Sequence, residues 1–100
     1  MKPVIIHGQA KVELSEAIAF YEHRQSGLGQ ALQKEVERVV QAIQRHPKSS
    51  PPYKDTGFRH QPVRRFPYVI FYVELTDTIW IAAVAHQKRR PDYWRRRRTQ

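Results

Sequence analysis

The sequence predicts an α+β domain in which a helical hairpin packs on an antiparallel sheet, in the order β-α-α-β-β-β with a short basic tail. Two observations predict this class: two helical stripes of apolar residues in the first half, and a pair of apolar strand-like runs in the second. A third, the length of 100 residues, allows one hydrophobic core and therefore a single domain over residues 1–100.

The central hairpin of the sheet is predicted over residues 68–75 and 78–85, which are rich in β-branched and aromatic residues. Thr76 and Asp77 between them form a polar pair of the length that a tight hairpin needs. Neither run alternates cleanly between apolar and polar residues. We therefore expect these strands to be covered on both faces, or covered on one and lined by aromatic rings on the other.

Two helices are predicted, over about residues 10–24 and 28–45, joined by a turn that contains Gly27. In the first, Leu14, Ala17, Ile18 and Tyr21 recur at helical spacing. In the second, the residues at this spacing are Leu32, Val36, Val39, Val40 and Ile43. The two stripes must be buried against the later sheet, because the chain offers no other apolar surface.

The remaining segments complete the predicted order. Residues 3–7 are expected to form a first strand at an edge of the sheet, and residues 58–63 a strand before the hairpin. Residues 47–57 are a proline-rich connection within the domain, and residues 92–98 are expected to form a last helical turn.

The net charge of +9 is concentrated in the second half of the chain. Residues 51–100 carry eleven Lys and Arg against four Asp and Glu, which gives +7 of that charge. This asymmetry favours an acidic partner, either nucleic acid or an acidic protein. The alternative is a solvated tail that keeps the protein in solution.

The composition also excludes several classes of site. The absence of cysteine rules out disulfides and thiolate metal sites and is consistent with a reducing cytosol. The five histidines lack metal-ligand spacing, and no phosphate-binding glycine loop occurs, so we expect neither a metal nor another cofactor. The acidic residues are expected mainly on helix surfaces. No apolar run is long enough for a membrane span, and we expect a cytoplasmic protein.

The segment after the last strand combines arginines with aromatic rings: Arg89, Arg90, Tyr93, Trp94 and Arg95. This mixture suits phosphate contacts with base stacking, or an acidic protein surface with aromatic anchors. Alternatively, the aromatic residues fold back onto the sheet, which we favour for Trp94 and leave open for Tyr93. His86 at the strand end is more often a structural hydrogen-bonding residue than a catalyst, and Arg65 lies in the turn before the central strand.

Four motifs occur along the chain in this order: Ala17-Ile18-x-x-Tyr21, Gly27-x-Gly29, Arg65-Phe66-Pro67-Tyr68-x-Ile70-x-Tyr72 and Ala85-His86-x-x-Arg89-x-Pro91-x-Tyr93-Trp94-x-x-Arg97. With the element order they make nearly the whole sequence similar to the RelE/ParE toxin superfamily of bacterial type II toxin–antitoxin systems. The last two motifs resemble the ParE, or plasmid stabilisation, branch.

The resemblance implies a toxin held inactive by a cognate antitoxin. The net charge of +9 and the small core favour an acidic, partly disordered antitoxin, and the toxin is expected to form a homodimer or a toxin–antitoxin heterotetramer. The antitoxin is expected to lay an apolar helix across the helical hairpin and the exposed face of the sheet. ParE-like members poison DNA gyrase. RelE-like members cleave mRNA on the ribosome, using basic residues on the sheet with a C-terminal Arg and Tyr.

The sequence departs from the RelE pattern on the sheet. Val69 stands where RelE-like members carry an arginine, and residues 59–63 lack their lysines, although Arg89 and Tyr93 remain. We therefore favour gyrase inhibition without catalysis over a ribosome-dependent endoribonuclease or a non-toxic member. In an endoribonuclease the catalytic residues would be Arg65, His86, Arg89 and Tyr93. The residues expected to contact the target are Arg65, His86, Lys88, Arg89, Arg90, Tyr93, Trp94, Arg95 and Arg97.

Overall fold

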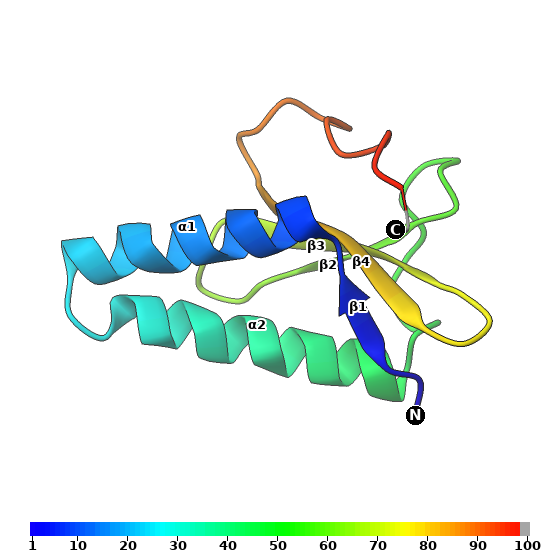
Figure 1. Ribbon diagram of the computed structural model, residues 1–100, viewed down its shortest axis with the longest axis horizontal. Helices are drawn as coiled ribbons and strands as arrows, with labels where there is room; N and C mark the ends of the chain where they lie inside the picture. The colour runs from blue at the N-terminus through cyan, green and yellow to red at the C-terminus, as the bar shows by residue number, and fades with distance from the viewer. Residues whose placement is uncertain (99–100) are drawn as a thin grey trace.

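The structure, a computed structural model, describes residues 1–98 and confirms the predicted order of elements. Its helices and strands are β1 (Val4–Ile6), α1 (Gly8–Arg24), α2 (Leu28–Arg45), β2 (Arg59–Pro62), β3 (Tyr68–Glu74) and β4 (Ile79–His86). The two helices run antiparallel beside one face of the sheet (Figure 1). None of the helices described is both long and apolar enough to cross a membrane.

The four strands form one sheet in the order β1-β4-β3-β2, with β1 at an edge as predicted. Strand β3 is antiparallel to both β2 and β4. Strand β1 is parallel to β4, with Val4 opposite Ile79, so the sheet is mixed where a wholly antiparallel one was expected. The physical reason is that β1 joins the sheet through a crossover that contains the helical hairpin, which allows the parallel direction.

The turn between the helices depends on close backbone approach. A Cβ atom at Gly29 would lie 2.5 Å from the Ile18 carbonyl oxygen, so only glycine fits there. The Glu22 carboxylate accepts hydrogen bonds from the backbone N–H groups of Gly27 (2.8 Å) and Gly29 (2.9 Å) at the start of α2. These bonds, that of Gly27 above all, lower the pKa of Glu22. A side chain of α1 thus caps α2.

The helix-facing core contains the predicted stripe of α2. Leu32, Val36, Val39 and Ile43 are buried, and Val40 packs against them at the margin. From the sheet they meet the buried side chains of Ile70, Tyr72, Ile79 and Ile81. The predicted stripe of α1 is confirmed as well, with Ala17 buried and Leu14, Ile18 and Tyr21 partly buried against the same core.

The opposite face of the sheet carries a second cluster of apolar and aromatic residues, which we call the outer cluster. It consists of buried Phe71, Trp80, Ala82, Ala83, Ala85 and Trp94, with Tyr53, Phe58, Val69, Val73 and Tyr93 packed around them. The connection before β2 and the tail after β4 supply Tyr53, Phe58 and Trp94, and both segments lie on this side of the sheet (Figure 1). This face was expected to be open to an antitoxin, and it is instead covered by the chain itself.

The tail forms turns where a helical turn was expected. The N–H of Arg95 donates to the Asp92 carbonyl (3.1 Å), and the N–H of Arg97 donates to the Trp94 carbonyl (3.0 Å). Asp92 has a left-handed backbone conformation, with φ of 65°, which is incompatible with a regular right-handed helix. Burial of the Trp94 side chain then fixes the path of the chain.

The helix-facing core predicts the cost of truncating Ile43, whose exposed fraction is 2%. Ile43→Ala should lower the free energy of unfolding by about 2–5 kcal/mol, because the removed methyl groups leave a cavity. Gln41→Ala, at an exposed position of the same helix, is the matched control and should change it by less than about 0.5 kcal/mol. Denaturant unfolding measures both, and equal stabilities would show that Ile43 does not contribute to the core.

Candidate functional site

The candidate site lies beside a β-bulge in β4. Tyr72 lies opposite Ile81 and Phe71 lies opposite Ala83, so Ala82 is an extra residue in β4. The neighbouring strand β1 ends at Ile6, whose partner is Ile81. Beyond that point no strand within residues 1–98 lies beside this edge of β4, and its backbone groups need other partners.

Glu13 of α1 and Arg97 of the tail supply those partners. The N–H of Val84 donates to Glu13 Oε1 at 3.0 Å, and Arg97 Nη1 donates to the Ala82 carbonyl at 2.8 Å. The two side chains also bind each other through both carboxylate oxygens, with distances of 3.2 and 2.8 Å. Their exposed fractions are only 12% and 10%, so this pair is largely screened from water.

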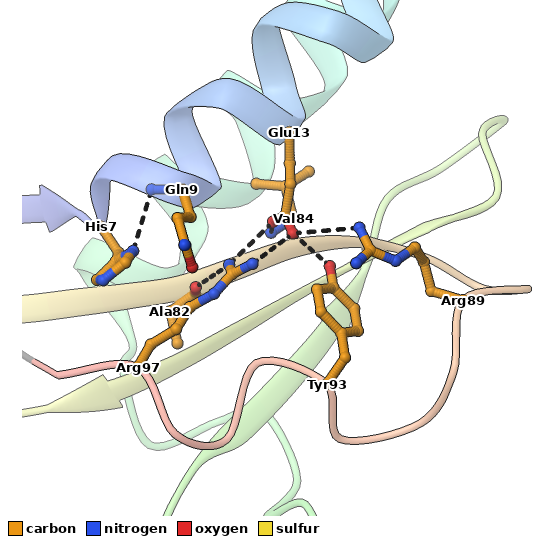
Figure 2. Close-up of polar contacts among 8 residues, drawn as sticks. All are labelled: His7, Gln9, Glu13, Ala82, Val84, Arg89, Tyr93 and Arg97. Carbon is orange, nitrogen blue, oxygen red and sulfur yellow. Dashed lines mark hydrogen bonds and ion pairs between the residues drawn. The ribbon is translucent and has the colours of Figure 1, made fainter.

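Two more side chains of the tail converge on the same carboxylate (Figure 2). The Tyr93 hydroxyl donates to Glu13 Oε2 at 2.5 Å, and Arg89 Nη1 lies 3.8 Å from that oxygen. The guanidinium of Arg89 also lies over the Tyr93 ring, 3.7 Å from its centroid. Burial, and then the bond to Glu13, raise the pKa of Tyr93 well above its usual value, so the phenol keeps its proton.

Asp92 provides a second attachment, to the connection before β2. Its carboxylate accepts hydrogen bonds from the Tyr53 hydroxyl (2.6 Å) and Lys54 Nζ (3.2 Å), and it lies 3.5 Å from Arg95 Nη1. The bond from Tyr53 is the main cause of a lowered pKa at Asp92. Between the two attachments, Trp94 stacks on Phe71 with ring centroids 4.4 Å apart.

The structure brings three predicted site residues, Arg89, Tyr93 and Arg97, together around Glu13. Trp94 is 1% exposed and supports this surface from below, so the prediction that it contacts the target is wrong. Its burial agrees with the alternative favoured from the sequence, in which Trp94 folds back onto the sheet. Tyr93 also folds back, and it lies partly buried.

The other predicted site residues lie around this group or apart from it. Lys88, Arg90 and Arg95 are exposed along the tail. His86 lies at the end of β4, where its Nδ1 accepts the N–H of Lys88 at 3.0 Å and its ring meets the Tyr68 ring edge-on. Arg65 is on the turn before β3, and its guanidinium lies over Phe66.

Sequence reasoning missed Glu13, Tyr53 and Asp92. Glu13 was expected on the helix surface, but it lies in line with the buried residues Ala10 and Ala17, three and four residues away. A carboxylate flanked at this spacing by small apolar residues was the available signal, because it faces the sheet with them. Nothing in the local sequence indicated that residue 53 would reach residue 92.

A hollow of about 200 Å³ adjoins this group between α1 and the end of β4. Its lining combines charge with aromatic surface and includes Glu16, Phe20, Tyr68, His86, Arg89 and Tyr93. In residues 1–98 no three His, Cys, Asp or Glu side chains are grouped so as to hold a metal ion. The site is thus a basic and aromatic surface held on a largely buried carboxylate.

Removal of the Glu13 carboxylate should loosen the tail. Glu13→Ala leaves the Arg97 guanidinium and the Val84 N–H without their partner, and should lower the free energy of unfolding by on the order of 3 kcal/mol. Trypsin should then cut within residues 88–98 faster than in the original protein. Glu16→Ala, an exposed position of the same helix, is the control and should change neither quantity. Equal unfolding and cleavage in both variants would contradict the role assigned to Glu13.

Comparison with known proteins bears on this arrangement. Residues 4–91 match the family described as "ParE toxin of type II toxin-antitoxin system, parDE". The fold is similar to a solved structure described as "Chromosomal ParDE TA system from P. aeruginosa", with a TM-score of 0.76 and 15% identity. The match covers 86% of this chain and 96% of that chain. No curated protein matches the sequence significantly. Because the family match spans most of its length, the chain belongs to the ParE toxin family of type II toxin–antitoxin systems.

Proposed function

We propose that this toxin acts in the cytoplasm, inhibits DNA gyrase and is neutralised by a cognate antitoxin. The observation that carries the proposal is the attachment of Arg89, Tyr93 and Arg97 to the single carboxylate of Glu13. These side chains include the Arg–Tyr pair that RNA cleavage would use, and here they fasten the tail. A fastened basic tail favours a binding surface over a catalytic centre.

Two features weigh against an endoribonuclease. Cleavage of mRNA needs a group that moves a proton and cations that hold the phosphate. The Tyr93 hydroxyl already donates to Glu13, and its raised pKa makes it a poor acid and disfavours the phenolate that would act as a base. Val69, at the position where RelE-like members carry an arginine, is packed against the outer cluster.

One observation favours the endoribonuclease as the second candidate. Arg89 and Tyr93 lie in contact, as a phosphate-binding cation and a neighbouring catalytic phenol would. That activity would require Tyr93 to be released from Glu13 on the ribosome. The nuclease mechanism therefore needs a free Tyr93 hydroxyl, whereas gyrase inhibition needs the hydroxyl bound to Glu13.

The surface proposed for the antitoxin lies on α1. Val12 and Phe20 are 53% and 52% exposed, and their spacing of eight residues places them on neighbouring parts of the helix surface. Phe20 borders the hollow at the end of β4, beside His86 and Arg89. An amphipathic helix of an acidic antitoxin would place apolar side chains on Val12 and Phe20 and carboxylates toward the basic end.

Two assays separate the candidate mechanisms. We expect the purified toxin to inhibit supercoiling by gyrase or to trap cleaved plasmid DNA, and to leave mRNA on programmed ribosomes intact. Tyr93→Phe should reduce the gyrase effect partially, because it removes one of the internal hydrogen bonds that fasten the binding surface to Glu13. In a nuclease the same change should abolish cleavage while the protein remains folded.

Each outcome of the two assays has a definite consequence. Codon-positioned mRNA cuts that disappear in Tyr93→Phe would reject gyrase inhibition and establish the endoribonuclease. A folded toxin that is silent in both assays would reject both mechanisms and identify a non-toxic family member.

The antitoxin surface predicts the effect of changing Phe20. Co-expression with the neighbouring antitoxin gene should give a complex that co-purifies in moderate salt, and Phe20→Ser should weaken it by on the order of tenfold or more. Leu75→Ser is the matched control, because Leu75 is another exposed apolar residue and lies at the hairpin between β3 and β4. Equal weakening in both variants would place the antitoxin elsewhere.

A further inference from the structure

The cations of the tail divide into two groups by their partners. Arg89 and Arg97 are paired with Glu13, and Arg95 lies near Asp92 at 3.5 Å with about half of its side chain exposed. Arg90, Arg96 and Arg98 are exposed, and no carboxylate of residues 1–98 lies within 4 Å of their guanidinium groups. These three charges therefore contribute nothing to the fold through ion pairing.

The three arginines of this second group are gathered in one place, together with Arg95. Arg90, Arg95, Arg96 and Arg98 line a single open hollow of about 800 Å³, together with Pro91, Asp92 and Tyr93. Asp92 is the one carboxylate in the lining, and it is already engaged by Tyr53 and Lys54. We call this feature the arginine hollow. Its net charge is strongly positive because four guanidinium groups surround one neutralised carboxylate.

The backbone beneath the arginine hollow is ordered before any partner arrives. Trp94 is buried against Phe71, Arg97 is bound to Glu13 and Asp92 is bound to Tyr53. The exposed arginines therefore project from a fixed segment. Preorganisation of this kind reduces the conformational entropy that is given up on binding.

The aromatic residues of the tail offer little free surface to a partner. Trp94 is buried, and the Tyr93 ring lies beneath the guanidinium groups of Arg89 and Arg97, whose distances to its centroid are 3.7 and 5.2 Å. Single-stranded nucleic acid binds through aromatic rings on which its bases stack. Protein interfaces depend on aromatic or apolar anchors. The arginine hollow has only Pro91 and the partly covered Tyr93 ring for such contacts, and it presents mainly cations.

We propose that the arginine hollow binds the phosphodiester backbone of a DNA duplex directly and without sequence preference. Guanidinium groups bind phosphate oxygens through paired hydrogen bonds, and a duplex presents phosphates in a regular array. This goes beyond gyrase inhibition, because the toxin itself contacts DNA whether or not gyrase is present.

The test uses the purified full chain and a labelled DNA duplex without gyrase, over a range of salt concentrations. Arg90→Gln/Arg96→Gln/Arg98→Gln should weaken binding by on the order of tenfold or more, and should reduce the slope of log affinity against log salt by about 0.9 for each phosphate that the protein no longer neutralises. The matched control is Lys34→Gln/Arg45→Gln/Lys48→Gln, which removes the same charge from exposed positions elsewhere. It should retain near-original affinity and slope.

Competition experiments and an unfolding control complete the test. An unlabelled DNA or RNA duplex should displace the labelled duplex. Comparison of the two competitors shows whether the site distinguishes the DNA backbone from the RNA backbone. Polyglutamate should compete far less well than either. Equal weakening in the two triple variants, equal competition by polyglutamate, or tighter binding of single strands than of duplex would each overturn the proposal. Both triple variants should unfold at the original temperature, which separates an effect on binding from an effect on folding.

Failure of this proposal is distinguishable from failure of the proposed function. DNA binding without gyrase inhibition would support the arginine hollow and reject the gyrase mechanism. Gyrase inhibition that survives in the arginine triple variant, with no DNA binding by the original protein, would do the reverse.

Discussion

The Glu13 carboxylate of α1 binds both the edge of the sheet and the C-terminal tail. It accepts the N–H of Val84 where β1 no longer covers β4, and it neutralises Arg97, which in turn satisfies the Ala82 carbonyl. A β-sheet normally protects such an edge with another strand or a loop. Here a bidentate ion pair between side chains distant in sequence does so. The position of the tail follows from the need to satisfy this edge.

Most of the fold could be predicted from local patterns. The bounds of α2, the stripe that includes Ile43 and the edge position of β1 follow from helical spacing and from strand length. The parallel direction of β1 could not be read in this way, because direction is a property of the crossover and leaves no local signal. The turn conformation of the tail was missed for a related reason, since burial of Trp94 outweighs local helical preference.

The candidate site was predictable in its basic half and hidden in its acidic half. Arg89, Tyr93 and Arg97 are conspicuous in the sequence because they are charged or aromatic and close together. Glu13 and Asp92 are ordinary acidic residues whose importance comes from partners that are far away along the chain, 84 residues in the case of Glu13 and Arg97. The family match ends at residue 91, so the segment that contains Tyr93 and Arg97 lies beyond the part of the chain that it covers.

Both tryptophans of the chain, Trp80 and Trp94, lie in the outer cluster, and the helix-facing core has none. The indole fluorescence of this protein therefore originates entirely on one side of its sheet. Detachment of the tail would expose Trp94 to water and would change the emission, while repacking of the helices alone would leave both indoles in place. The molecule thus carries an intrinsic optical reporter for the outer face of its sheet, in which Trp94 responds to the basic end, and it requires no added label.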